Sequence, residues 1–312
     1  QLRDEMVNTI EGSNFDPVVS LSSKRMDIFW VTAQSSDTEV AKRTALRSVY
    51  QAIVQDAELF DLSKSEMPLL ESSLSPEDAF NAYCERWYCF DQDYRAFCEH
   101  AGYAAAHDWD VLKGLEDRVE DLYGNTFLVK LGLSWGKMID TSLLQSWSID
   151  GIPNQQRFYS NYVRPILNQG DDRRVYVIIS DALRYEAAEE LSRDINGRYR
   201  MQAKLEAQLG VLPSYTGLGM ASLLPHQELA YAKNGTVEVD GQSTAGIVQR
   251  GKILARVNGV AVKAEALMKM TKDEGRDFIK PYRVVYIYHD HIDAVGDKAA
   301  TESRTFNAVR ET

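Results

Sequence analysis

The stretch "RRVYVIISDALRYEAAEEL" (Arg173–Leu191) decides the fold of the second half of this 312-residue chain. Its run over 175–180 is short, apolar and rich in β-branched residues, which is typical of a strand buried on both faces of a sheet. The following run over 182–195 has the pattern of a helix, and Asp181 stands at the junction. A strand that leads into a helix predicts an α/β layer, in which polar groups that do chemistry gather where strands end.

The rest of the second half continues this alternation of patterns. We expect, in chain order, an amphipathic helix from Phe158 to Leu167, a strand-like segment over 199–209, a short helix over 215–224, a hairpin and loop over 234–260, a helix over 260–278 and a second buried strand over 282–288. Together these elements predict an α/β domain with a mainly parallel sheet flanked by helices.

Residues 1–150 have the pattern of helices throughout. The stretch "SPEDAFNAYCERWYCFDQDYRAFCEHAG" begins with Ser75 as an expected N-cap and Pro76 at the first helical position. Its aromatic residues recur every three or four positions, which indicates one apolar face packed against other helices. Gly and Pro interrupt the pattern over 148–156. We therefore predict an all-helical scaffold or partner-binding domain over 1–150 and an α/β domain over 151–312.

Composition and charge limit the classes of function. The chain is 44% hydrophobic and 26% charged, as in soluble globular proteins. It has no apolar run of about 18 residues and no secretory signal, so we expect no membrane association and a cytoplasmic setting. Residues 1–150 carry 13 Lys+Arg and 26 Asp+Glu, a balance of −13, whereas residues 151–312 carry 22 and 20, a balance of +2. The net charge alone does not indicate nucleic-acid binding. Metal ions bound in an acidic site would, however, make the local electrostatic potential positive.

Three cysteines, Cys84, Cys89 and Cys98, lie within one helical pattern. An odd number without a secretory signal favours reduced thiols. A metal cluster with His100 is the alternative, but the spacings fit no common zinc pattern, and buried core thiols are the favoured interpretation.

Two candidate positions for chemistry precede the last strand. Asp181 ends the first strand and is either a metal ligand or, with Ser180, a cap of the following helix. In "LPSYTGLG" (Leu212–Gly219), Thr216 stands at an expected helix start. A hydroxyl there suits a nucleophile or an anion site, and the alternative is a threonine N-cap followed by glycines for tight packing.

The third candidate is "YIYHDHIDAVGDK" (Tyr286–Lys298), at the end of the second strand. In strand register His289, His291 and Asp293 project to one side. Asp293 and Asp297 are four residues apart across an expected turn, so they could close on one cation. The alternatives are a zinc pair made by the two histidines, or a polar strand end with a helix that starts near Gly296.

The order of these three segments resembles the alkaline phosphatase superfamily. "SDALR" is similar to the Asp-Gly-Phe-Arg opening of nucleotide pyrophosphatase/phosphodiesterases, and "PSYT" is similar to their Pro-x-x-Thr nucleophile segment. "DAVGD" is similar to the Asp-x-x-Gly-His of that family and of the cofactor-independent phosphoglycerate mutases. The segments "VIISDALRYEAAEEL", "LPSYTGLGMASLLP" and "HIDAVGDK" most resemble the PglZ domain of BREX phage-defence systems, a resemblance that covers residues 170–312.

The resemblance implies roles for individual residues. Asp181 would bind one metal, Thr216 would be the nucleophile that touches the same metal, and Asp293 and Asp297 would bind a second metal. Arg184 matches the arginine that follows the first aspartate in the family.

His289 and His291 become candidates for facing the substrate or supporting the ligands. The implied cofactors are two divalent metals, with zinc expected first. Because Asp297 stands where phosphodiesterases have histidine, a harder oxygen donor shifts the preference toward manganese or magnesium. The later Asp-His pair and final histidine of the superfamily are expected beyond Thr312, which implies that the sequence is an internal piece with an incomplete α/β domain.

The implied activity is that of a metal-dependent phosphoryl-transfer hydrolase of phosphodiesterase or nuclease type in bacterial BREX phage defence. DNA or a nucleotide phosphodiester is the expected substrate, and other BREX proteins are expected partners that dock on the helical half. The alternative function is a non-catalytic assembly module that keeps the phosphatase-like fold.

Overall fold

The computed structural model describes residues 16–27, 37–298 and 305–312, and the parts of the expected helical runs in 1–15, 28–36 and 299–304 lie outside these ranges. The chain forms two compact units. The helical unit contains 1–146 together with 185–203, and the α/β unit contains 147–184 together with 204–312. The domain division at residue 150 stays a prediction. The two compact units have different bounds, because residues 185–203 belong to the helical unit.

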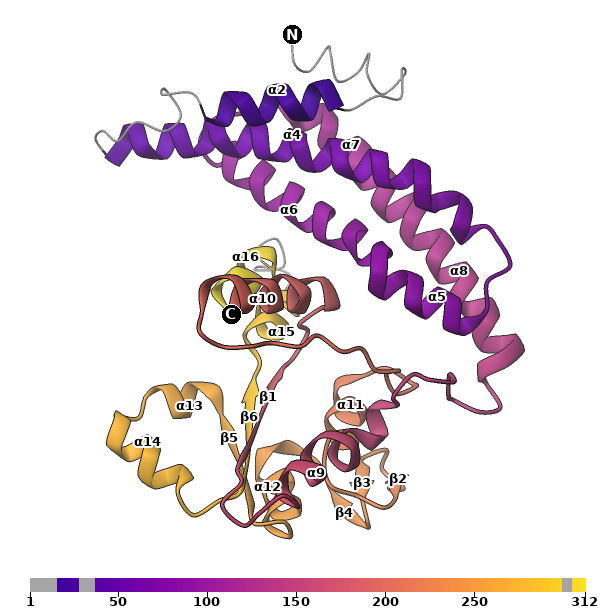
Figure 1. Cartoon of the computed structure of the whole chain (residues 1–312), viewed down its shortest axis with the longest axis vertical. Helices are drawn as coiled ribbons and strands as arrows, with labels where there is room; N and C mark the ends of the chain where they lie inside the picture. Colours follow the sequence, from indigo (N-terminus) through magenta and orange to yellow (C-terminus); the bar gives the residue numbers. More distant parts are fainter. Residues whose placement is uncertain (1–15, 28–36, 299–304) are drawn as a thin grey trace. The chain divides into compact units, whose positions relative to one another are not determined.

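The helical unit confirms the expected all-helical class of the first half. Its long helices α4 and α6 lie side by side, and α2 packs on α4 (Figure 1). Its elements are α2 (Asp16–Met26), α4 (Asp37–Leu70), α5 (Pro76–Ala82), α6 (Tyr88–Ala105), α7 (Lys113–Glu120), α8 (Val129–Met138) and α10 (Tyr185–Arg198), with π-helical turns η1 (Tyr83–Trp87), η2 (Asp121–Leu128) and η3 (Ile139–Leu143).

The structure agrees with the predicted helix cap and the predicted apolar face in this unit. The Ser75 hydroxyl accepts a hydrogen bond from the Asp78 backbone N–H at 3.0 Å, so it caps α5. The aromatic face is core: Phe90 is fully buried and stacks on Phe127 with ring centroids 4.0 Å apart. The cysteine thiols are free and partly buried, and burial raises the pKa of Cys98 to about 11. Such thiols pack and are poorly reactive.

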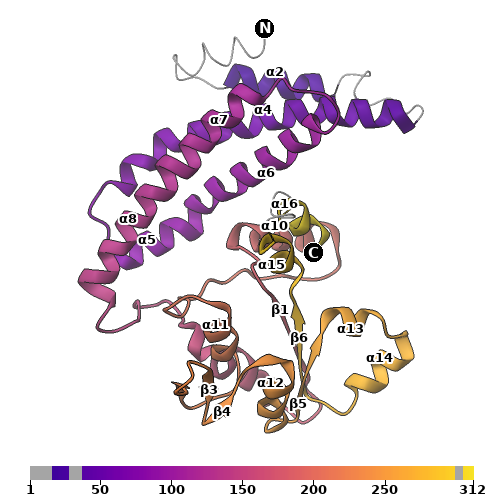
Figure 2. The ribbon, with the colours of Figure 1, turned by 180° about the vertical axis from the view of Figure 1, so that it is seen from behind.

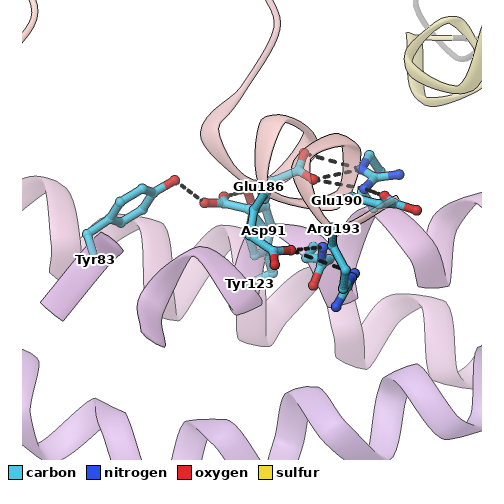
Figure 3. Close-up of polar contacts among 9 residues, drawn as sticks. Tyr83, Asp91, Tyr123, Glu186, Glu190 and Arg193 are labelled. Carbon is cyan, nitrogen blue, oxygen red and sulfur yellow. Dashed lines mark hydrogen bonds and ion pairs between the residues drawn. The ribbon is translucent and has the colours of Figure 1, made fainter. Parts of the chain in front are cut away.

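A buried ion cluster joins α10 to α6, and we call it the Arg95 cluster (Figure 3). The side chains of Arg95 and Glu186 are 3% and 1% exposed. Arg95 donates to Glu186 through Nε at 3.0 Å and Nη2 at 2.8 Å, and to Glu190 through Nη2 at 2.5 Å. Because each buried charge has an opposite partner with good geometry, the cluster fixes α10 on α6.

Two buried aspartates in the helical unit, Asp91 and Asp56, differ in their hydrogen bonding. Asp91 accepts hydrogen bonds from the hydroxyls of Tyr83 and Tyr123, each at 2.5 Å (Figure 3). Asp56 is completely buried, and among the described residues neither of its carboxyl oxygens has a hydrogen-bond partner. Burial raises the pKa of Asp56 to about 7, against the opposing charge of Arg118.

The α/β unit contains the predicted parallel sheet. β1 (Val175–Ser180), β6 (Val284–His289) and β5 (Gly259–Lys263) form it in the order β1-β6-β5, with both pairs parallel. A second, antiparallel sheet is made by β2 (Leu229–Tyr231), β3 (Val237–Val239) and β4 (Gln242–Ser243). The helical elements are η4 (Gln155–Arg157), η5 (Tyr159–Val163), α9 (Arg164–Leu167), α11 (Thr216–Ser222), α12 (Gly246–Ala255), α13 (Ala264–Met268), α14 (Lys272–Ile279), α15 (His291–Gly296) and α16 (Thr305–Glu311).

The core of this unit sits around the central strand. Val284 and Tyr286 of β6 are completely buried, as expected for a central parallel strand. The prediction that β1 is also buried on both faces is wrong for the described structure, since Tyr176 is 48% and Ile178 is 69% exposed. β1 is an edge strand, and its alternate side chains are uncovered on one face.

Three other local predictions need correction. Residues 199–208 form no strand ladder, and Leu209 makes only an isolated bridge with Asn154. The expected loop at the end of 234–260 is helix α12, which packs on β5 (Figure 2). The expected start of the helix over 260–278 is strand β5, which begins at Gly259, where a Cβ atom would approach the Leu254 carbonyl oxygen to 3.0 Å. No helix in the described part of the chain is both long and apolar enough to span a membrane.

Candidate active site

The parallel pairing of β1 and β6 brings the first and third predicted segments together (Figures 1 and 2). Ser180 and His289 are register partners at the ends of the two strands. The Asp181 backbone N–H donates to the His289 carbonyl oxygen at 2.8 Å, and the Ser180 hydroxyl lies 3.0 Å from His289 Nδ1. The segment that follows β6 therefore leaves the sheet beside Asp181.

A tight turn positions the Asp181 carboxylate. Ala182 has a left-handed backbone with φ +62°, a region that non-glycine residues seldom adopt. Asp181 Oδ1 accepts a hydrogen bond from the Ala182 N–H at 3.1 Å, and α10 begins only at Tyr185. The carboxylate thus supports its own turn. Arg184 follows in the same turn and is exposed.

The predicted strand register of the third segment is wrong beyond His289. The strand ends there, and α15 begins at His291, so His289, His291 and Asp293 do not share one face of a strand. Asp293 and Asp297 are instead one helical turn apart, and the Asp297 N–H donates to the Asp293 carbonyl oxygen at 2.9 Å. The proximity of Asp293 and Asp297 therefore comes from one turn of helix α15 and not from the alternation of a strand.

The two histidines have separate partners. His289 is linked to the Ser180 hydroxyl, whereas His291 Nε2 lies 2.9 Å from a carboxylate oxygen of Glu311 in α16. Their ring centroids are 6.2 Å apart. The described structure thus gives each ring its own hydrogen bond, which favours a supporting role over a zinc pair.

Four aspartates, which we call the strand-end carboxylates, influence one another electrostatically: Asp181, Asp290, Asp293 and Asp297. Burial, then the charges of Asp293 and Asp290, raises the pKa of Asp181, while Arg250 opposes the shift. Burial, then the charges of Asp297 and Asp290, raises the pKa of Asp293. Like charges held together in this way cost energy that a bound cation would relieve.

Thr216 lies in a pocket of about 260 Å³ in the same unit. It is exposed and is the first residue of α11, whose N-cap is Tyr215. The threonine N-cap expected as an alternative is therefore wrong, and the hydroxyl is available to a ligand in the pocket. Arg250 from α12 lines the same pocket.

Sequence reasoning missed Arg250 because α12 was expected to be loop. Its Nε donates to the Gly246 carbonyl oxygen at 3.3 Å, and its Cζ lies 4.2 Å from the ring centroid of Tyr288. Its Nη1 also contacts the Met220 sulfur. The "GIVQRGKILA" run, with apolar residues three and four apart, was the available signal for this helix.

The fit of the site to metal ions is partial. Among the described residues, no three or more His, Cys, Asp or Glu side chains are grouped so that they could hold one ion. The strand-end carboxylates still fit divalent cations in kind, because they are oxygen donors, and burial followed by the neighbouring negative charges raises the pKa of Asp181 and Asp293.

Comparison with known proteins identifies a family for the second half of the chain. Residues 158–312 match the family model described as the BREX system PglZ alkaline phosphatase-like domain. The chain belongs to the PglZ family. This PglZ-family chain is 42% identical over 293 residues to the alkaline phosphatase-like protein BrxZ of Escherichia coli O9:H4 (strain HS). It is 36% identical over 271 residues to the alkaline phosphatase-like protein PglZ of Bacillus cereus (strain H3081.97).

The two matches cover 93% and 86% of the chain, so the similarity extends from the PglZ domain well into the helical unit. They cover 33% and 31% of the relatives, so the chain spans about a third of the length of the curated relatives it matches. The expected resemblance to PglZ domains is confirmed.

Proposed function

We propose that this chain carries part of the active site of a metal-dependent phosphoryl-transfer hydrolase, of phosphodiesterase or nuclease type, that acts in BREX phage defence. The observation that carries the proposal is the parallel pairing of β1 with β6, which sets Asp181 beside the segment with Asp293 and Asp297. The exposed hydroxyl of Thr216 lies in a pocket of the same unit.

Two divalent cations would be held by Asp181 and Thr216 on one side and by Asp293 and Asp297 on the other, with zinc expected first and manganese or magnesium as alternatives. Support comes from the raised pKa of Asp181 and Asp293, since a cation relieves the repulsion that burial intensifies. When bound, such ions neutralise charge on a transferring phosphoryl group and lower the pKa of a hydroxyl.

The Thr216 hydroxyl would act as the nucleophile. Its oxygen forms a bond to phosphorus while the bond from phosphorus to one ester oxygen breaks; the hydroxyl proton passes to solvent, and the leaving oxygen takes a proton from solvent. Water then cleaves the bond between phosphorus and the threonine oxygen of this covalent diester, which releases a phosphomonoester and restores the threonine. The exposed position of Thr216 at the start of α11 suits an attack on a substrate that approaches from solvent.

The proposal also covers the cellular compartment, the substrate and the partner proteins. We place the protein in the cytoplasm, with DNA or a nucleotide phosphodiester as substrate and with other BREX proteins docked on the helical unit. The −13 balance of residues 1–150 supports this division of labour, because an acidic surface repels polyanions and suits protein partners.

The test is phosphodiester cleavage by the full-length protein with added zinc or manganese. We expect Thr216→Ala and Asp181→Ala to reduce the rate by at least about 10³-fold, because nucleophile and electrostatic stabilisation are each worth several kcal/mol. Ser214→Ala is a matched control, since Ser214 is an exposed hydroxyl residue two positions earlier. Full activity in both site variants would refute the proposal.

A second candidate function is a non-catalytic assembly module that keeps the fold. The acidic balance of 1–150 and the similarity to relatives outside the PglZ domain favour it. If partner binding depends on residues 1–150 and ignores Thr216 and Asp293, and no cleavage is found, this candidate replaces the first.

A further inference from the structure

We propose that Arg250 binds the non-bridging oxygens of the reacting phosphate, and that the pocket it shares with Thr216 receives that phosphate and its immediate neighbours from an extended phosphodiester. This inference rests on the proposed function and names the substrate-binding residue of the same site. It concerns a residue that no sequence motif singled out.

The first support is the composition of the pocket. Thr216 from α11 and Arg250 from α12 both line it. Much of the remaining wall is small, with Gly217, Gly235 and Gly246 among the lining residues. Of the described residues that line the pocket, Arg250 alone carries a charge. The pocket therefore has a positive lining next to the proposed nucleophile, which suits an anionic ligand.

The second support is the way Arg250 is held. Its guanidinium lies over the Tyr288 ring at 4.2 Å, and its Nε is anchored on the Gly246 carbonyl oxygen. Both contacts orient the planar group without neutralising its charge. Among the described residues, no carboxylate forms an ion pair with Arg250. A phosphate group could therefore pair with its charge.

Arg95 and Arg250 differ in whether carboxylates pair with the guanidinium. Arg95 forms ion pairs with Glu186 and Glu190 at N–O distances of 2.8 Å or less, so its guanidinium donates to carboxylates that hold the helices together. Arg250 is partly exposed and lines the same pocket as Thr216.

The third support is size. A volume of about 260 Å³ is below the range of roughly 300–1,000 Å³ typical of pockets that enclose a whole drug-sized ligand. A phosphate and its adjoining atoms fit within it, and the rest of a polymer could remain outside. The pocket thus favours an extended phosphodiester over a ligand that must be enclosed completely.

The test measures binding of inorganic phosphate to the full-length protein by isothermal titration calorimetry, without any substrate. We expect Arg250→Met to weaken phosphate binding by about tenfold to a hundredfold, because a charge-assisted hydrogen bond is lost. Arg250→Lys should lie between, since it keeps the charge but loses the planar fork. Lys252→Met, which removes an exposed cation two residues along α12, should bind as the wild type does.

A kinetic measurement separates this inference from the proposed function. With bis(p-nitrophenyl) phosphate as substrate, Arg250→Lys should raise KM more than it lowers kcat. Phosphate binding that is equal in Arg250→Met, Lys252→Met and wild type overturns the inference even if the wild type cleaves the diester. Binding that depends on Arg250 in a protein that cleaves no diester supports the anion site and refutes the hydrolase. Arg250→Lys keeps the test decisive if Arg250→Met does not fold.

Discussion

The Arg95 cluster of the helical unit and the strand-end carboxylates of the α/β unit use ionised groups in opposite ways. In the Arg95 cluster, the buried carboxylate of Glu186 and the partly exposed carboxylate of Glu190 meet a buried guanidinium at hydrogen-bonding distance. Among the strand-end carboxylates, burial and then the neighbouring negative charges raise the pKa of Asp181 and of Asp293, and Lys263 pairs with Asp290 at 3.4 Å. Matched charges hold helices together, whereas we propose that the like charges at the strand ends bind a cation.

The largest effect on stability should come from breaking the matched cluster. Arg95→Met leaves Glu186 buried without its partner, so we expect a loss of about 3–5 kcal/mol in the free energy of unfolding, measured by urea denaturation. The control is Arg193→Met, because Arg193 is 62% exposed in its pair with Glu189 and should change stability by less than about 0.5 kcal/mol. Equal effects in the two variants would show that the Arg95 cluster is not a structural anchor.

A smaller effect should come from Asp56, which is buried without a partner among the described residues. Its folded-state pKa of about 7 lies above the ordinary value of 3.8. The protonated group therefore supports folding fully below about pH 4, and this contribution is lost as pH rises through 7. Between pH 5 and 8 we expect the wild type to lose about 1–3 kcal/mol more than Asp56→Asn, measured by urea denaturation at each pH.

Asp93 serves as the internal reference for that pH series. Burial and the charge of Glu58 raise its pKa to about 7 as well, so Asp56→Asn should keep part of the slope. A slope that is the same in wild type and Asp56→Asn would mean that Asp56 is solvated in solution.

The smallest effect on stability should come from the strand-end carboxylates. Asp293→Asn removes a charge whose pKa burial and the neighbouring aspartates raise, so the metal-free variant should be slightly more stable than wild type at pH 8. Because the group is partly exposed, we expect a gain below about 1 kcal/mol, seen as a higher Tm without metal. A clear loss of stability would indicate a structural role instead.

Much of the fold followed from local patterns. The apolar runs over 175–180 and 282–288 became β1 and β6, and their parallel pairing confirmed the α/β class. β5 was missed because its five residues run directly into α13, so the helical pattern of the following segment hid the strand. Because the sequence patterns did not predict β5 and α12, they did not indicate Arg250 as a site residue.

Long-range contacts account for the other differences. α10 counts with the helical unit because Arg95 binds Glu186, 91 residues away, and no local pattern encodes that pairing. The strand ended at His289 because its partner β1 ends at Ser180, and the next residues could then form α15. The sequence predicted that Asp293 and Asp297 face each other across a tight turn; they are instead one turn of helix α15 apart.

The most direct test of the central claim is calorimetric titration of zinc and of manganese into the metal-depleted full-length protein. We expect the wild type to bind divalent metal, and Asp181→Asn and Asp293→Asn each to weaken binding by at least about tenfold. Asp273→Asn, which alters an aspartate that is 88% exposed in α14, should bind as the wild type does. If all four proteins bind metal equally, or none binds it, the strand-end carboxylates are not a cation site and the account is wrong.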